Sequence, residues 1–184
     1  MKIKAVEKIV RAEHSITLIG TEAGNQWIAA TGAMYPLYGF PRMDKPSVFA
    51  WMDVPEKKRQ SFAFRHDPEF YEEWDFSDAA VGEIFVERGL YSVNTPTRCM
   101  EPLNVSDGVI YLDSAYMKPF GEGALLYERR SKSGRLYIAV KEGLLLKGII
   151  LPMLIERSFA DDLLDIARQT MLAKNYIVSE ETEE

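Results

Sequence analysis

Three short strands joined by two tight turns are predicted by residues 126–153, LYERRSKSGRLYIAVKEGLLLKGIILPM, the most regular stretch of the chain. The segments ALLYERR and RLYIAVK flank the turn SKSG, and a second turn at Glu142–Gly143 leads into LLLKGIILPM. LYIAVK alternates between apolar and polar residues, whereas LLLKGIIL is nearly continuous. The last strand is therefore predicted to be buried on both faces, with Ile149 and Ile150 in apolar surroundings.

A strand that is buried on both faces needs two covers. Short helices elsewhere in the chain are expected to supply one of them. The C-terminal segment carries Phe159, Leu163 and Ile166 on one stripe, which predicts an amphipathic helix over 158–175 as the nearest second cover. If that helix packs elsewhere, a partner has to supply the cover.

The other elements are read from local patterns of the same kind. Ile3, Val6 and Val10 recur at helical spacing, although the first residues also suit a strand. Strands are predicted over 15–20, 26–37 with a bend in the middle, 61–66 and 109–113. Helical segments are predicted over 45–54 with Asp44 as the cap, 55–60 and 114–120.

Two segments carry weaker patterns. Residues 94–108 contain two prolines and the turn pair Asp107–Gly108, which predicts a loop. Residues 80–89 suit a strand or a short helix. The elements together predict an α+β fold: a mainly antiparallel sheet with a few short helices and a C-terminal amphipathic helix. One globular domain is expected over 1–176, followed by an acidic disordered tail over 177–184.

Composition excludes several classes of site. The chain has one cysteine, so it can form no internal disulfide and no zinc site with two or more thiolate ligands. No window approaches the roughly 18 apolar residues of a membrane helix, and the N-terminus does not read as a signal peptide. We expect a cytoplasmic protein with no membrane contact and no cofactor.

Charge is distributed unevenly along the chain, whose net charge is −6. Residues 1–66 hold 10 Lys and Arg against 6 Asp and Glu, while residues 67–157 hold 10 against 15. An acidic chain of this kind does not coat nucleic acid with its whole surface. It leaves room for a local basic patch in the first third.

The best candidates for that patch lie in the N-terminal helix. Lys4, Lys8 and Arg11 fall on the face opposite the apolar residues, where all three can reach one phosphate backbone. The alternative is that they only keep a surface helix solvated. Aromatic residues concentrated between 27 and 51 can stack on bases, but a role in the core is the preferred interpretation.

No residue pattern in the sequence points clearly to enzyme chemistry. The segment 66–76, HDPEFYEEWDF, gathers five carboxylates, four aromatic rings and His66. A solvated acidic loop is the preferred interpretation over a cation or acid–base site. Cys99 follows Arg98, but no nucleophile signature surrounds it. The chain contains no P-loop, no G-x-S-x-G and no G-x-G-x-x-G.

Residues 109–153 resemble the second half of a DNA sliding-clamp domain. VIYLDSAYMKPF is similar to the strand that leads into a short helix in clamps, and YIAVKEGLLLKGIILPM resembles their closing hairpin. The chain departs from clamps because Pro119 shortens the helix, the length is too small for several clamp domains, and the C-terminal helix is extra. In style the sequence also resembles uncharacterised proteins of bacterial phages and mobile elements.

The resemblance implies a protein over whose helices duplex DNA passes without being read in sequence. Lys118, in the second short helix, joins Lys4, Lys8 and Arg11 as a candidate contact. We therefore expect a non-enzymatic accessory or scaffold protein that forms a homo-oligomer and works near DNA. The alternative is a small enzyme or ligand-binding protein that uses the acidic–aromatic region 66–76.

Overall fold

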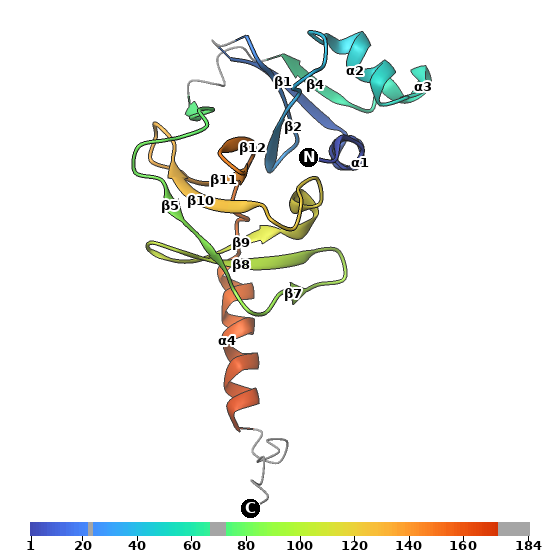
Figure 1. The fold of residues 1–184 in the computed structure, drawn as a ribbon. Helices are drawn as coiled ribbons and strands as arrows, with labels where there is room; N and C mark the ends of the chain where they lie inside the picture. The colour runs from blue at the N-terminus through green and yellow to red at the C-terminus, as the bar shows by residue number, and fades with distance from the viewer. Residues whose placement is uncertain (22–23, 67–72, 173–184) are drawn as a thin grey trace, which may run out of the picture. The chain divides into compact units, whose positions relative to one another are not determined.

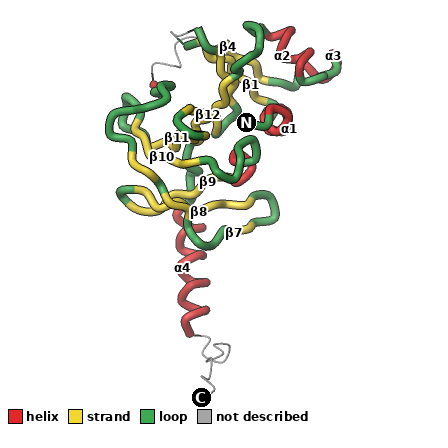
Figure 2. Tube along the Cα trace, in the orientation of Figure 1, coloured by secondary structure: helices red, strands yellow, loops and turns green. Residues whose placement is uncertain are grey.

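The computed structural model describes residues 1–21, 24–66 and 73–172. The chain divides into two compact units, Met1–Met153 and Leu154–Glu184. The sequence predicted a single domain over 1–176, and the acidic tail expected over 177–184 lies outside the described residues. Each unit is described by itself below (Figures 1 and 2).

The first unit contains twelve strands and several short helices. Its helical segments are α1 (Ile3–Glu13), α2 (Lys45–Trp51), α3 (Glu56–Arg59) and the 3₁₀ segment η2 (Ser114–Met117). Its strands are β1 (Ser15–Gly20), β2 (Gln26–Ala29), β3 (Ala33–Pro36), β4 (Ala63–His66), β5 (Ile84–Phe85), β6 (Glu87–Arg88), β7 (Val93–Asn94), β8 (Cys99–Val105), β9 (Gly108–Asp113), β10 (Leu125–Arg130), β11 (Leu136–Glu142) and β12 (Leu145–Ile150).

A large sheet of eight strands organises this unit. Its strand order is β4-β1-β2-β3-β12-β11-β10-β5, and all neighbours are antiparallel except β1 and β4. A smaller sheet has the order β6-β8-β7, with β9 paired to β8. The predicted α+β fold with a mainly antiparallel sheet is confirmed.

The large sheet has two halves of similar topology. In one half α1 precedes the meander β1-β2-β3, and in the other η2 precedes the meander β10-β11-β12. The last strands of the two meanders pair with each other, so that Ile149 lies opposite Met34 and Ile150 opposite Ala33. The sheet is continuous across this junction.

The meander predicted over 126–153 is present as β10, β11 and β12. Its two turns place Gly134 and Gly143 at φ values of 83° and 64°, which glycine adopts without steric strain. Val140 lies opposite Gly148 and Lys141 opposite Leu146, so Lys147 is an extra residue in β12. This bulge reverses the alternation of β12 and turns Leu146 toward the same face as Ile149.

Both faces of β12 are buried, as predicted. Ile149 and Ile150 are each 0% exposed and belong to two different apolar clusters on opposite faces of the sheet. The cluster around Ile150 also receives side chains from α1, α2 and η2. The cover of the Ile149 face, expected from the C-terminal helix, is supplied within the first unit by Trp74 and Phe76.

The prediction of a loop over 94–108 is wrong, because seven of these residues form β8. Pro102 lies inside this strand opposite Tyr111 of β9, and its carbonyl accepts a hydrogen bond from the Gly89 amide at 2.8 Å. Gly89 lies in the gap between β6 and β7. A strand tolerates proline where its missing N–H faces such a gap in the ladder, so β8 continues through Pro102.

The N-terminal segment is a helix rather than a strand, and β1 follows it directly. The Asp44 side chain accepts hydrogen bonds from the Ser47 backbone and hydroxyl, which confirms it as the cap of α2. Residues 80–89 contain the two short strands β5 and β6. These strands resolve the alternative that the sequence left open.

The second unit contains α4 (Arg157–Leu172). The helix predicted over 158–175 is present from Arg157 to Leu172, and the last three residues of the predicted range lie outside the described residues. None of the helices in the described part of the chain combines the length and apolar character that a membrane span requires.

Candidate functional site

The three basic residues predicted in the N-terminal helix lie on one exposed side of α1. Lys4, Lys8 and Arg11 follow the i, i+4, i+7 spacing of a single helix face, and all three are exposed. The opposite face packs Val6 and Val10 into the core, both of them 0% exposed. We call Lys4, Lys8 and Arg11 the α1 basic stripe.

Arg11 is the one member of this stripe with an ion pair among the described residues. Its Nη1 lies 3.3 Å from Oε1 of Glu7, one turn earlier on the same helix. An exposed pair of this kind is worth well under about 1 kcal/mol, so it leaves Arg11 available to a phosphate. Lys4 and Lys8 form no ion pair with any residue in the described ranges.

The fourth predicted contact, Lys118, lies at the end of η2, which is attached to α1 at two points. The Lys2 amide donates to the Pro119 carbonyl at 2.6 Å, and the Tyr116 hydroxyl donates to Oε1 of Glu13 at 2.6 Å. Burial, and then the nearby Glu13 carboxylate, raise the pKa of Tyr116, so its hydroxyl keeps the proton that it donates. The structure thus brings exposed Lys118 close to the start of α1.

The acidic–aromatic region 66–76 is described only in part, because residues 67–72 lie outside the described ranges. The Glu73 carboxylate accepts hydrogen bonds from the hydroxyls of Ser131 and Ser133 in the β10–β11 turn. These bonds hold the pKa of Glu73 below its usual range. In the described part of the region, therefore, the Glu73 carboxylate has a structural role, because it attaches this segment to the β10–β11 turn.

A buried ion cluster lies beside this region. Arg129 of β10 and Lys141 of β11 have side chains that are only 2% and 6% exposed, and both pair with Glu83. The Arg129 guanidinium also donates to the carbonyls of Asp75 and Ser77, at 3.1 and 2.9 Å. Together these contacts attach the segment that precedes β5 to the large sheet.

No metal centre forms from these carboxylates. Within the described ranges, no group of three or more His, Cys, Asp or Glu side chains converges on a point that could hold a metal ion. Cys99 is a half-buried residue at the start of β8, paired with Asn94 of β7, and is a free thiol. The interpretation of Cys99 as a structural residue is in line with this position.

The aromatic residues between 27 and 51 are mostly part of the core. Trp27, Tyr35 and Phe49 are at most 2% exposed, and burial raises the pKa of the Tyr35 hydroxyl, which donates to the carbonyl of Tyr116 at 3.0 Å. Tyr38 is the exception, with 42% of its surface exposed. A base-stacking platform made of these rings is therefore not present in the described surface.

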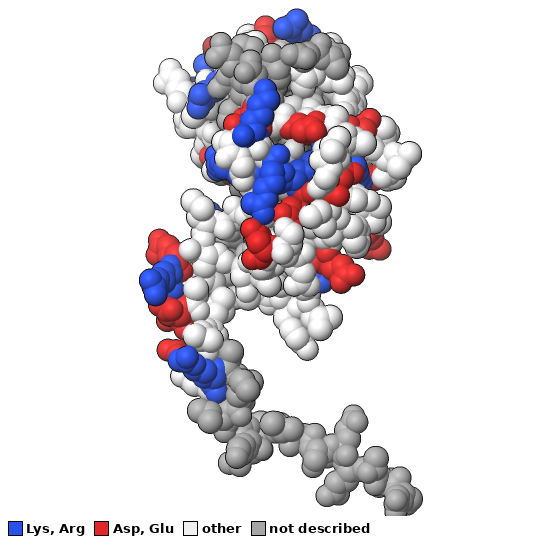
Figure 3. All heavy atoms as spheres, turned by 90° about the vertical axis from the view of Figure 1, so that its left-hand side faces the viewer, with Lys and Arg blue, Asp and Glu red and all other residues white. Residues whose placement is uncertain are grey.

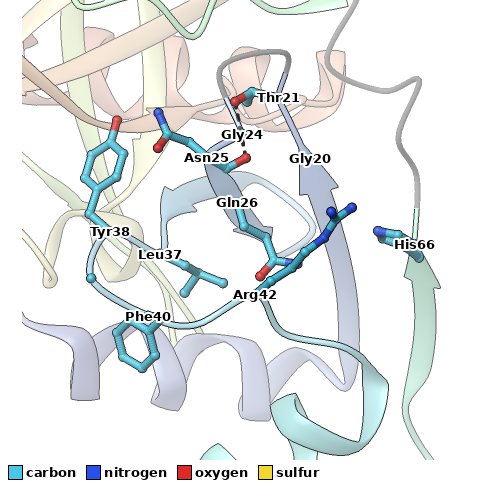
Figure 4. Close-up of a pocket in the computed structure, with 11 residues that line it drawn as sticks. Gly20, Thr21, Gly24, Asn25, Gln26, Leu37, Tyr38, Phe40, Arg42 and His66 are labelled. Atoms are coloured by element: carbon cyan, nitrogen blue, oxygen red, sulfur yellow. Dashed lines mark hydrogen bonds between the residues drawn. The ribbon is translucent and has the colours of Figure 1, made fainter.

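Two hollows lie side by side near the carboxyl end of β1. The smaller one, of about 230 Å³, is lined by Gly20 and Thr21, by Gly24 to Gln26, and by the loop after β3. The larger one, of about 560 Å³, is lined by the start of α2 and by Leu18 and Phe64. Arg42 and His66 line both hollows, and Figure 4 shows their side chains extending toward each other. We call this pair of hollows the Arg42 groove.

The backbone next to Arg42 is held by one side-chain amide. Gln26 of β2 donates from Nε2 to the Met43 carbonyl, and its Oε1 accepts from the Met43 amide, both at 2.8 Å. These two bonds hold the backbone of Met43, directly after Arg42, in a single position relative to β2. The loop that carries Arg42 is therefore anchored to the large sheet.

This groove was not predicted from the sequence, in which His66 was grouped with the acidic residues that follow it. Arg42 has no periodic pattern around it, and nothing local indicates that β4 runs parallel to β1 and brings His66 beside the loop. A signal that was available is the pair of prolines in GFPRMDKP, which restricts the backbone on both sides of Arg42.

Charge elsewhere on the surface is mixed. Figure 3 shows the side of the molecule that carries β5 and β10, where basic and acidic side chains lie next to each other. This face has no extended patch of one sign. It offers no alternative to the α1 basic stripe as a surface for a polyanion.

Comparison of the chain with protein-family models, with curated proteins and with solved structures returned no match.

Proposed function

We propose that this protein is a non-enzymatic scaffold that contacts duplex DNA through the α1 basic stripe, in the manner of a clamp-like factor. The observation that carries the proposal is the geometry of Lys4, Lys8 and Arg11. They share one exposed helix face that is opposite the buried face, so a phosphate backbone can reach all three. Contacts with phosphates position a protein on DNA without reading sequence.

The topology of the large sheet supports the clamp-like part of the proposal. A helix followed by a three-stranded meander occurs twice, and the two meanders join through β3 and β12. The helical segments of the two halves, α1 and η2, are hydrogen bonded to each other. In this proposal exposed Lys118, directly after η2, adds a further contact to those of the α1 basic stripe. The parallel strand β4 and the separate small sheet are additions to this plan.

The acidity of the chain is compatible with weak DNA binding. Only the local face meets the phosphates, and the other charges repel them, which favours loose contact and movement along the duplex. The alternative of a small enzyme or ligand-binding protein that uses region 66–76 stays open, because residues 67–72 lie outside the described ranges.

The test is a titration of labelled duplex DNA, followed by fluorescence anisotropy, over a series of salt concentrations. Three phosphate contacts predict that log K falls with log salt with a slope of about −2.7. The variant Lys4/Lys8/Arg11→Ala should lose most of the binding and most of this slope. Its matched control is Lys57/Lys58/Lys132→Ala, which removes the same charge from exposed positions outside the stripe.

The control variant should bind as the unmodified protein does. Failure of the unmodified protein to bind duplex at low salt would contradict the proposal. Equal losses in the two triple variants would show that net charge, and not the α1 basic stripe, governs binding.

A further inference from the structure

We propose that the Arg42 groove binds a phosphate group carried by a small organic ligand. The first observation is an excess of donors without acceptors. Arg42 and His66 extend toward each other across the groove, and neither has an ion-pair partner among the described residues. The two nitrogen-bearing side chains face one gap, and an anion between them can accept a hydrogen bond from each.

A third donor side chain lies in the Arg42 groove. Lys45 lines the larger hollow, and its Nζ lies 5.6 Å from the centre of the Phe64 ring and 6.0 Å from that of Phe49. These rings hold the ammonium group at the wall of the groove without neutralising it. The groove thus presents a guanidinium, an ammonium and an imidazole to one ligand.

The acid in the groove does not cancel this charge. Asp44 lines the larger hollow, but its Oδ1 accepts from the Ser47 amide at 2.9 Å and from the Ser47 hydroxyl at 2.6 Å. The carboxylate is oriented toward the first turn of α2 by these two bonds. Among the described residues that line the groove, three donor side chains remain against one carboxylate that is already hydrogen bonded.

The site is ordered before any ligand arrives. The two hydrogen bonds from Gln26 fix the backbone directly after Arg42, so little loop freedom is lost on binding. Gly24 and Gly39 line the smaller hollow at φ values of 77° and 80°, a conformation that other residues rarely adopt. A Cβ at either position would meet no atom within 4 Å, so the glycines leave that rim open.

The number of donors favours phosphate over carboxylate. A phosphomonoester carries up to two negative charges and three terminal oxygens, which suits a guanidinium fork together with two further donors. Leu18 and Phe64 give the larger hollow an apolar wall against which an organic group can pack. Volumes of about 230 and 560 Å³ match ligands of the size of a mononucleotide.

Such a phosphate can belong to a free metabolite or to the end of a nucleic-acid strand. The shared chemistry is a terminal phosphate, and the experiment separates the two sources. The proposal uses none of the residues of the α1 basic stripe, so it stands or falls independently of the proposed function.

The experiment is isothermal titration of the full chain with inorganic phosphate, a nucleoside 5′-monophosphate, the same nucleoside without phosphate, and acetate. The monophosphate should bind, and the nucleoside and acetate should bind at least about tenfold more weakly, because charge-assisted hydrogen bonds are lost. Short single strands with and without a 5′-phosphate form the second arm. A gain from the 5′-phosphate would identify a strand end as the source, and its absence would identify a free ligand.

The variants are Arg42→Gln and His66→Asn, with Lys57→Gln as the control. Lys57→Gln removes the same charge as Arg42→Gln from an exposed position on α3 that lines neither hollow. Arg42→Gln should weaken monophosphate binding by about tenfold or more, and the control should change it by less than about twofold.

Arg42 is exposed, so thermal unfolding of its variant should match that of the unmodified protein and separate a binding defect from misfolding. Absence of saturable monophosphate binding by the unmodified protein would overturn the proposal. So would equal affinity for acetate, or equal weakening by Arg42→Gln and Lys57→Gln.

Discussion

Arg129 and Lys141 are buried charged residues in a sheet whose other buried residues are mostly apolar. Glu83 forms an ion pair with each of them, and its side chain is itself only 17% exposed. Burial alone would raise the pKa of Glu83, but hydrogen bonds from Lys141 and Arg129 outweigh it and hold the pKa below its usual range. The folded state therefore contains Glu83 as a carboxylate.

Removing that carboxylate should destabilise the protein strongly. In Glu83→Gln the two cations stay buried without a counter-charge, which we expect to lower the free energy of unfolding by about 3–5 kcal/mol. The control is Glu122→Gln, the same chemical change at an exposed glutamate, which should cost less than about 0.5 kcal/mol. Urea unfolding measures both values, and a loss below about 1 kcal/mol for Glu83→Gln would contradict the structural role of the cluster.

The pH dependence gives a second readout of the same cluster. A carboxyl group whose pKa is depressed in the folded state contributes stability above its unfolded pKa and loses it as pH falls through the folded one. The ordinary pKa of glutamate is 4.5. The difference in unfolding free energy between the unmodified protein and Glu83→Gln should therefore persist at neutral pH and narrow below pH 4.5. A difference that is independent of pH would mean that Glu83 acts through shape and not through charge.

At the scale of the element, β12 holds the sheet together because it is the junction between the two meanders. It pairs with β11 on one side and with β3 on the other, and its side chains enter apolar clusters on both faces. Gly148 allows the Phe120 ring to lie directly on the strand, since a Cβ at this position would collide with that ring. The strand therefore combines two interfaces and a close ring contact within six residues.

Truncating β12 at its centre should be costly. Ile149→Ala removes a side chain that is 0% exposed, and we expect a loss of about 2–5 kcal/mol in the free energy of unfolding, from lost burial and the cavity left behind. Leu144→Ala, in the turn before the strand, is the matched control because Leu144 is 87% exposed. Its effect should stay below about 0.5 kcal/mol, and an equally small effect of Ile149→Ala would show that β12 is not a core strand.

At the scale of the whole molecule, the large sheet ends in two strands that have one neighbour each. These are β4 and β5, and most of their residues are exposed. An open edge presents unpaired backbone groups that can pair with another chain. Ile84 of β5 adds an exposed apolar side chain to this edge, with 49% of its surface accessible.

We therefore expect the protein to form a homo-oligomer through a sheet edge. Sedimentation velocity should show a species larger than the monomer at micromolar concentration, and Ile84→Lys should shift it toward the monomer because a charge blocks edge pairing. Leu125→Lys is the control, since Leu125 is 39% exposed on β10, which has a neighbouring strand on both sides. A monomer alone at ~100 µM would rule out stable assembly.

Parts of the fold were predictable from the sequence because their signals are local. The meander of β10, β11 and β12 follows from apolar alternation and two glycine turns, and α1 follows from apolar residues at helical spacing. The exposed position of Lys4, Lys8 and Arg11 follows from the same periodicity, because the residues opposite them must face the core. A local pattern misleads where its rule has an exception. Proline usually interrupts a strand, but β8 continues through Pro102.

Only the tertiary structure decided which distant segments meet. Trp74 and Phe76 cover the second face of β12, Glu83 neutralises Arg129, and the parallel pairing of β4 with β1 brings His66 to Arg42. Each of these contacts joins residues that are far apart in the chain, so neither propensity nor periodicity near either residue specifies it. The sequence by itself determined the elements with clear local patterns and the faces that they bury. Packing determined which residues cover the sheet, which charges are buried and where the groove forms. The reason is that contact energy depends on neighbours that the local sequence does not specify.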